Sequence, residues 1–272
     1  MNKKTMFSLV VLVLFIISII SGNLHWNNKI ANATGQASEI KKTKVEVKEN
    51  GVNKAEKKQD VNSSFNEAYA KNLPDAVKEK LKKAAAEKKA VNLVIVGDEA
   101  SSSEKDAWTT KLTASLETAY GKGLWNVTVK AYTGESTDEL IANKRDKEIA
   151  KDNPDLILFE PPFITDNSKT GNGNSVANTQ KFVQALSTSA KGATIIIQPS
   201  NPVYGAKNYP KAIEALKQFA TQNGYTYIDH WEAWPDATTK AILPYLQEEF
   251  GFPSVKGHEV WARFVTDYFI AK

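Results

Sequence analysis

Three adjacent serines and three histidines are the groups in this chain that could supply a nucleophile and a base. The serines are Ser101, Ser102 and Ser103, and the histidines are His25, His230 and His258. A serine hydroxyl attacks an acyl carbon when a nearby imidazole takes its proton, so Ser101 with His258 or His230 is a candidate pair. The competing interpretation is structural: serines just ahead of a helix are typical of capping, and a histidine that opens a helix is typical of local hydrogen bonding.

Four acidic residues, Asp98, Glu99, Glu160 and Asp166, lie in the segments that come after two of the apolar runs. Paired carboxylates could supply acid and base for cleavage of a glycoside or hold a divalent cation, and the sequence gives no separation that would test either idea. The chain has no cysteine, which excludes thiol catalysis, disulfides and cysteine-ligated zinc or iron–sulfur clusters. With only three histidines, we expect neither a metal ion nor a cofactor.

The elements that would position these residues recur regularly between residues 75 and 272. Short apolar runs closed by turn residues are typical of buried strands, and they alternate with amphipathic stretches typical of helices. The predicted strands are residues 91–96, 126–132, 155–160, 194–198 and 225–229. The predicted helices are residues 76–89, with Asp75 as the N-cap, 106–120, 137–151, 175–190, 210–222 and 257–270. Five strands, each followed by a helix, predict a three-layer α/β/α domain with a five-stranded parallel sheet, similar to flavodoxin.

In such a sheet the functional site lies at the carboxyl ends of the strands. The segments at that edge are residues 97–103, 133–136, 160–167, 199–204 and 230–235, together with the loop before the last helix. Taken in order, they resemble the SGNH (GDSL-type) hydrolases. The resemblance rests on residues 94–98 (VIVGD), 132–137 (YTGEST), 165–167 (TDN) and 253–262 (PSVKGHEVWA). It implies acyl-ester hydrolysis or acyl transfer by a serine, a histidine and an aspartate, with an oxyanion site beside them.

Two catalytic positions that the resemblance implies hold other residues. Glu99 stands at the nucleophile position and Phe252 at the position of the base, while Glu249 stands at that of the orienting aspartate. Glutamate cannot replace serine efficiently as an acyl-enzyme nucleophile, and phenylalanine cannot accept a proton. The family's cleft and oxyanion positions fall on Asp98, Gly134, Asp166 and Asn167.

Besides a structural or partner-binding envelope protein, two functions therefore stay open for residues 75–272. The first is an esterase, deacetylase or acyltransferase that acts on an envelope glycan or lipid with a rearranged site, in which Ser101 and His258 would be catalytic. The second is an inactive SGNH-fold protein that binds envelope carbohydrate or lipid in the same cleft.

The first 74 residues predict export. Lys3 and Lys4 precede residues 6–20, of which thirteen are hydrophobic, and no Lys, Arg, Asp or Glu follows until Lys29. We expect residues 1–33 to be a single-pass membrane anchor with the rest of the chain outside the cytoplasm. The alternative is a signal peptide cleaved after Ala31-Asn32-Ala33, which would give a secreted protein.

Residues 34–74 are rich in Lys, Glu, Asn and Ser, and we expect them to form a disordered linker. Residues 1–90 carry 17 Lys and Arg against 9 Asp and Glu, whereas residues 91–272 carry 18 against 22. The basic charge thus belongs to the leader and linker, so we expect no nucleic-acid partner. We also expect a monomer.

Overall fold

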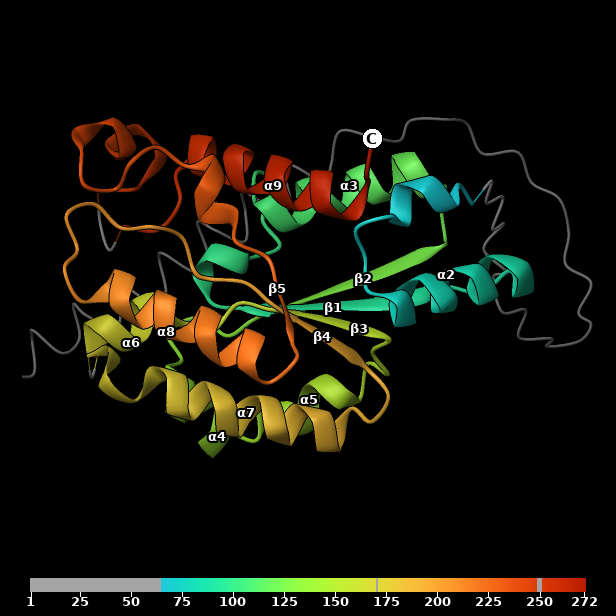
Figure 1. The fold of residues 1–272 in the computed structure, drawn as a ribbon, viewed down its shortest axis with the longest axis horizontal. Coiled ribbons are helices and arrows are strands. Elements are labelled where there is room, and N and C mark those ends of the chain that lie inside the picture. Colours follow the sequence, from blue (N-terminus) through green and yellow to red (C-terminus); the bar gives the residue numbers. More distant parts are fainter. Residues whose placement is uncertain (1–64, 170, 249–250) are drawn as a thin grey trace, which may run out of the picture. The chain divides into compact units, whose positions relative to one another are not determined.

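The apolar runs at the centre of the chain pair side by side in one parallel sheet (Figure 1). The computed structural model describes residues 65–169, 171–248 and 251–272. Its strands are β1 (Val91–Gly97), β2 (Trp125–Ala131), β3 (Leu156–Phe159), β4 (Thr194–Ile197) and β5 (Thr226–Tyr227), in the order β2-β1-β3-β4-β5. The predicted five-stranded parallel sheet is confirmed.

Helices cover both faces of the sheet (Figure 1). On one face lie α2 (Asp75–Glu87), α3 (Trp108–Tyr120) and α9 (Val255–Phe269), and on the other α4 (Thr137–Ala142), α5 (Arg145–Ala150), α6 (Phe163–Lys169), α7 (Ser175–Ser189) and α8 (Tyr209–Gln222). Successive side chains of a strand point to opposite faces, and β1 shows this clearly. Leu93 and Ile95 pack in the cluster with α3 and α9, whereas Val94 and Val96 pack in the cluster with α7 and α8.

Short 3-10 helices complete the description: η1 (Glu67–Ala70), η2 (Glu99–Ser101), η3 (Asn172–Asn174), η4 (His230–Ala233) and η5 (Lys240–Tyr245). The observed helices differ from the predicted ones in two places. The helix predicted over residues 137–151 is broken at Lys144, whose backbone is left-handed with φ of 54°. Helix α6 was not predicted, because seven residues with only two apolar side chains are too few to show a helical period.

The predicted linker extends too far toward the domain, because its last ten residues pack on the fold. The Phe65 ring stacks on Tyr120 with centroids 6.3 Å apart, and the carbonyl of Tyr69 accepts a hydrogen bond from the backbone N–H of Ala271. Leu73 is 2% exposed. Phe65, Tyr69 and Leu73 recur every four residues, a pattern obscured by the polar residues between them. The folded part therefore includes residues 65–74.

The predicted membrane anchor, residues 1–33, lies outside the described residues, as do residues 34–64 of the predicted linker. Within the described ranges, no helix combines the length and apolar character needed to cross a membrane.

Candidate active site

The end of β1 places Glu99 at the edge of the sheet that the sequence analysis indicated. The strand stops at Gly97, and the Asp98 side chain caps η2 by accepting a hydrogen bond from the N–H of Ala100 at 2.9 Å. Gly97 has no room for a side chain, because a Cβ there would lie 2.3 Å from a carboxylate oxygen of Glu160. This tight turn presents Glu99, one of whose carboxylate oxygens is buried without a hydrogen-bond partner among the described residues.

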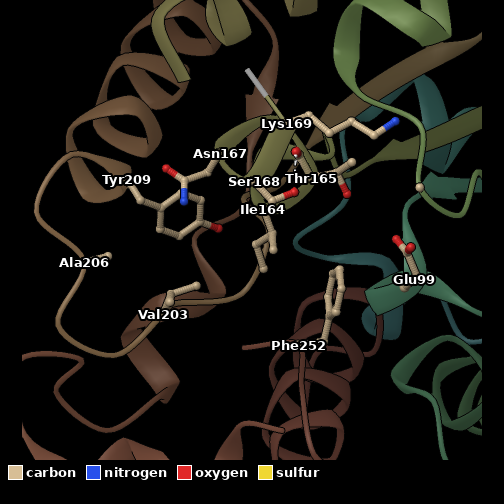
Figure 2. A pocket seen from close by; sticks show the side chains of 11 residues that line it. Glu99, Ile164, Thr165, Asn167, Ser168, Lys169, Val203, Ala206, Tyr209 and Phe252 are labelled. Atoms are coloured by element: carbon tan, nitrogen blue, oxygen red, sulfur yellow. Dashed lines mark hydrogen bonds between the residues drawn. The ribbon is translucent and has the colours of Figure 1, made fainter. Parts of the chain in front are cut away.

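A cavity of about 370 Å³ opens beside Glu99 (Figure 2). Its lining comes from η2, from the loop after β2, from α6, from the segment between β4 and α8, and from the segment before α9. The lining residues are Glu99, Gly134, Ile164, Thr165, Asn167, Ser168, Lys169, Val203, Ala206, Tyr209 and Phe252. These segments follow the carboxyl ends of the strands, where parallel sheets place their ligands.

Both positions that the family resemblance assigns to the nucleophile and the base contribute to this cavity. In the view of Figure 2, Glu99 and Phe252 are on one side of the cavity lining, and Val203, Ala206 and Tyr209 are on the other. The third assigned residue, Glu249, lies outside the described residues. At the two positions that the resemblance assigns to the nucleophile and the base, the cavity wall thus has a carboxylate and a phenyl ring.

Ser101 does not line the cavity. It is fully buried, and its hydroxyl donates a hydrogen bond to Oε2 of Glu160 at 2.7 Å. Burial raises the pKa of Glu160 well above its ordinary range, and the nearby Asp98 carboxylate adds to this effect. The serine therefore joins the end of β1 to the end of β3 and is not presented to a substrate.

The His258 ring is hydrogen-bonded to the backbone at the start of α3. Its Nδ1 accepts a hydrogen bond from the backbone N–H of Trp108 at 3.4 Å, at the first turn of α3. Burial lowers the pKa of His258 to about 4, so the ring is neutral at physiological pH. The structure does not bring Ser101 and His258 together, and the catalytic pair expected for these two residues is not formed.

His230, the other candidate base, belongs to the core. The Trp234 indole N–H donates to its Nδ1 at 2.9 Å, so the proton of the neutral ring is on Nε2, which donates to the carbonyl of Pro199 at 2.8 Å. The ring stacks on Trp261 with centroids 4.0 Å apart. Burial lowers the pKa of His230 to about 3. Both nitrogens are used, and no lone pair is free to take a proton.

The four residues assigned to the cleft and oxyanion positions divide into two kinds. Gly134 and Asn167 line the cavity, and Asn167 is exposed. Asp166 is buried and accepts hydrogen bonds from the backbone N–H and the hydroxyl of Thr137 at 2.7 and 2.8 Å, which hold the start of α4. Asp98 is fully buried, and burial, aided by the charge of Glu99, raises its pKa to about 7. Asp98 and Asp166 therefore stabilise the loops and do not face the cavity.

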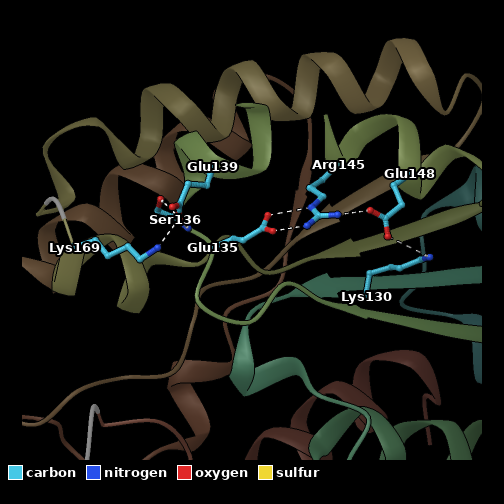
Figure 3. Close-up of polar contacts among 7 residues, drawn as sticks. All are labelled: Lys130, Glu135, Ser136, Glu139, Arg145, Glu148 and Lys169. Atoms are coloured by element: carbon cyan, nitrogen blue, oxygen red, sulfur yellow. Dashed lines mark hydrogen bonds and ion pairs between the residues drawn. The ribbon is translucent and has the colours of Figure 1, made fainter. Parts of the chain in front are cut away.

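An ion-pair network holds the loop that carries Gly134 (Figure 3). Glu135 binds the Arg145 guanidinium through both carboxylate oxygens, with Nε to Oε2 at 3.0 Å. Arg145 also binds Glu148 at 2.6 Å, and Glu148 lies 3.9 Å from the ammonium of Lys130. The bidentate arginine fixes the loop geometry more firmly than a single ion pair would.

The apolar wall is the part of the cavity that sequence reasoning missed. Ile164 comes from α6, which was not predicted. Val203 and Ala206 come from the long connection between β4 and α8, and Tyr209 is the first residue of α8. Such residues carry no chemical signature, since apolar side chains in loops are common. Within the described ranges, no three His, Asp or Glu side chains are grouped in a way that would hold a metal ion.

Comparison with known proteins gives matches at the level of structure. No protein-family model and no curated protein sequence matches the chain. Among solved structures, Axe2, an acetylxylan esterase from Geobacillus stearothermophilus, superposes with a TM-score of 0.54 at 15% identity, covering 66% of this chain and 94% of that one. A protein described as a GDSL-like lipase from Parabacteroides merdae has a TM-score of 0.57 at 8% identity, covering 66% and 96%. This chain has the SGNH/GDSL hydrolase fold.

A third SGNH/GDSL structure supports the same conclusion. The G-D-S-L family lipolytic protein of Desulfitobacterium hafniense has a TM-score of 0.52 at 17% identity, covering 65% of this chain and 99% of that one. The expected resemblance is thus confirmed for the fold of the domain. At these identities it carries no conclusion about the reaction, which depends on the side chains at the cavity.

Proposed function

We propose that this protein is an SGNH-fold binding protein that does not hydrolyse esters through a serine and a histidine. The observation that carries the proposal is the content of the cavity, where Glu99 and Phe252 occupy the assigned nucleophile and base positions. Ser101 and His258, the two residues that could have replaced them, are hydrogen-bonded to Glu160 and Trp108 instead.

The ligand class follows from the lining and from the predicted export. The cavity combines an apolar wall with a few polar groups at Glu99, Asn167 and Ser168, and its volume of about 370 Å³ is that of a small-molecule site. We therefore propose that it binds a carbohydrate or lipid component of the cell envelope. Export and tethering by residues 1–33 are part of this proposal, supported by the apolar run at residues 6–20 and the lysines before it.

The test combines a rate with a binding measurement on the full-length chain. We expect no hydrolysis of 4-nitrophenyl acetate above the faint level that an oxyanion site alone sustains. We also expect saturable binding of a neutral apolar fluorophore, N-phenyl-1-naphthylamine, that is lost when Ala206→Trp fills the cavity. Robust hydrolysis, or fluorophore binding that Ala206→Trp leaves intact, would overturn the proposal.

The second candidate is acyl-ester hydrolysis or transfer with a rearranged site, and it is favoured by the esterases among the structural neighbours. It requires that Ser101 leave Glu160 and that His258 leave Trp108. In that case the unmodified protein would hydrolyse 4-nitrophenyl acetate, and both Ser101→Ala and His258→Ala would abolish the rate.

A further inference from the structure

The charge of Glu99 is unmatched inside the cavity. One of its oxygens is fully buried and has no hydrogen-bond partner among the described residues. A buried carboxylate oxygen without a donor costs free energy, because the water that would solvate it has been removed. Glu99 is half-buried and lines the cavity, so a ligand that brings an N–H or O–H group to its carboxylate from the cavity side would offset part of that free energy.

The cation in the cavity lining does not compensate Glu99. The Lys169 ammonium lies 2.6 Å from Glu139, and the same carboxylate oxygen accepts a hydrogen bond from the Ser136 hydroxyl at 2.8 Å (Figure 3). Glu139 is outside the cavity lining, so the lysine charge is neutralised from outside. The remaining charge of the lining is negative and is located at Glu99.

The surroundings of Glu99 strengthen any interaction with a cation. The Phe252 ring and the side chain of Ile164 are part of the same cavity lining as Glu99 (Figure 2). Apolar walls exclude water and lower the local dielectric, so a charge pair is stronger there than at an open surface.

We propose that the cavity selects ligands that carry a protonated primary amine on an apolar body, with the ammonium bound by Glu99 and the body against Ile164, Val203 and Phe252. The inference rests on the proposed function, since it assumes that the cavity binds a ligand. The inference specifies that the ligand is a cation. It also assigns the selection of that cation to Glu99, the residue at the assigned nucleophile position.

The test compares three ligands of equal chain length: n-octylammonium, 1-octanol and octanoate. Each displaces N-phenyl-1-naphthylamine from the full-length chain at neutral pH and moderate ionic strength. We expect octylammonium to bind most tightly, octanol less tightly and octanoate most weakly. Glu99→Gln keeps the side-chain size and removes the charge, and we expect it to weaken octylammonium about tenfold to a hundredfold while leaving octanol within about twofold.

The matched control is Glu117→Gln. Glu117 is exposed on α3 and does not line this cavity, so the variant makes the same change in net charge at a distant place. We expect it to leave all three affinities unchanged.

The possible results distinguish failure of this inference from failure of the proposed function. If octanol binds but octylammonium has no advantage, or if Glu99→Gln leaves octylammonium binding intact, the inference is wrong and the proposed function stands. If Glu117→Gln weakens octylammonium as much as Glu99→Gln does, the preference comes from overall charge and the inference is wrong. If neither the fluorophore nor any of the three ligands binds, both proposals are wrong.

Discussion

The buried acid at the end of β1 makes stability depend on pH in a direction that can be calculated. Asp98 is fully buried, and burial raises its pKa from 3.8 to about 7. Asp98→Asn is the perturbation of choice, because an asparagine side chain can still accept the hydrogen bond from the N–H of Ala100 that caps η2. The variant removes the titrating group and keeps the local structure.

The sign follows from proton linkage. Between pH 4 and pH 7 the folded protein keeps the Asp98 proton that the unfolded chain has released, so the free energy of unfolding falls as pH rises. A pKa difference of about 3 units at 1.36 kcal/mol each amounts to about 4 kcal/mol in total. The contribution is fully present below about pH 4 and is lost by about pH 8. Between pH 5 and pH 8 the loss is about 3 kcal/mol.

The assay is urea unfolding of the wild type and Asp98→Asn at half-unit steps from pH 5 to pH 8.5. Burial lowers the pKa of His230 to about 3 and of His258 to about 4, so both histidines add stability as pH rises toward 6.5. Subtracting the variant from the wild type removes the contributions of the histidines and leaves that of Asp98 together with its coupling to the neighbouring Glu160 carboxyl. A difference between the two proteins that stays constant over this range would refute the argument that burial governs Asp98.

Three further predictions concern the cavity and the limits of the fold. Glu99→Ser with Phe252→His should raise the rate of 4-nitrophenyl acetate hydrolysis by more than the product of the two single effects, because nucleophile and base act as a unit. A double variant whose rate increase only equals that product would contradict the assignment of these residues to the nucleophile and base positions. Gly97→Ala should cost about 1–3 kcal/mol in urea unfolding, since its Cβ would lie 2.3 Å from Glu160, and an unchanged midpoint would contradict the tight turn. Leu73→Ala should cost about 2–5 kcal/mol in the same assay, whereas a residue of a solvated linker would cost nothing measurable.

The sequence by itself determined the sheet and the edge at which the site lies. Apolar runs such as residues 91–96 form strands that are buried on both faces of the sheet. Such a strand can be predicted without knowledge of its neighbours in the sheet, because the length of the run and the turn residues beside it are local features. The right-handed crossover rule then limits how such strands connect. Order and spacing along the chain also indicated that Glu99 and Phe252 hold the two catalytic positions, and both line the cavity.

Only the tertiary structure decided what the candidate catalytic residues do. Ser101 binds Glu160, 59 residues away in sequence, and His258 binds the N–H of Trp108, 150 residues away. Such partners depend on strand register and helix packing, which no local pattern contains. The same holds for residues 65–74, whose few apolar side chains gain their burial from Tyr120 and from the C-terminal segment. Local periodicity specifies an element, whereas the environment of a side chain is set by elements that are distant in sequence.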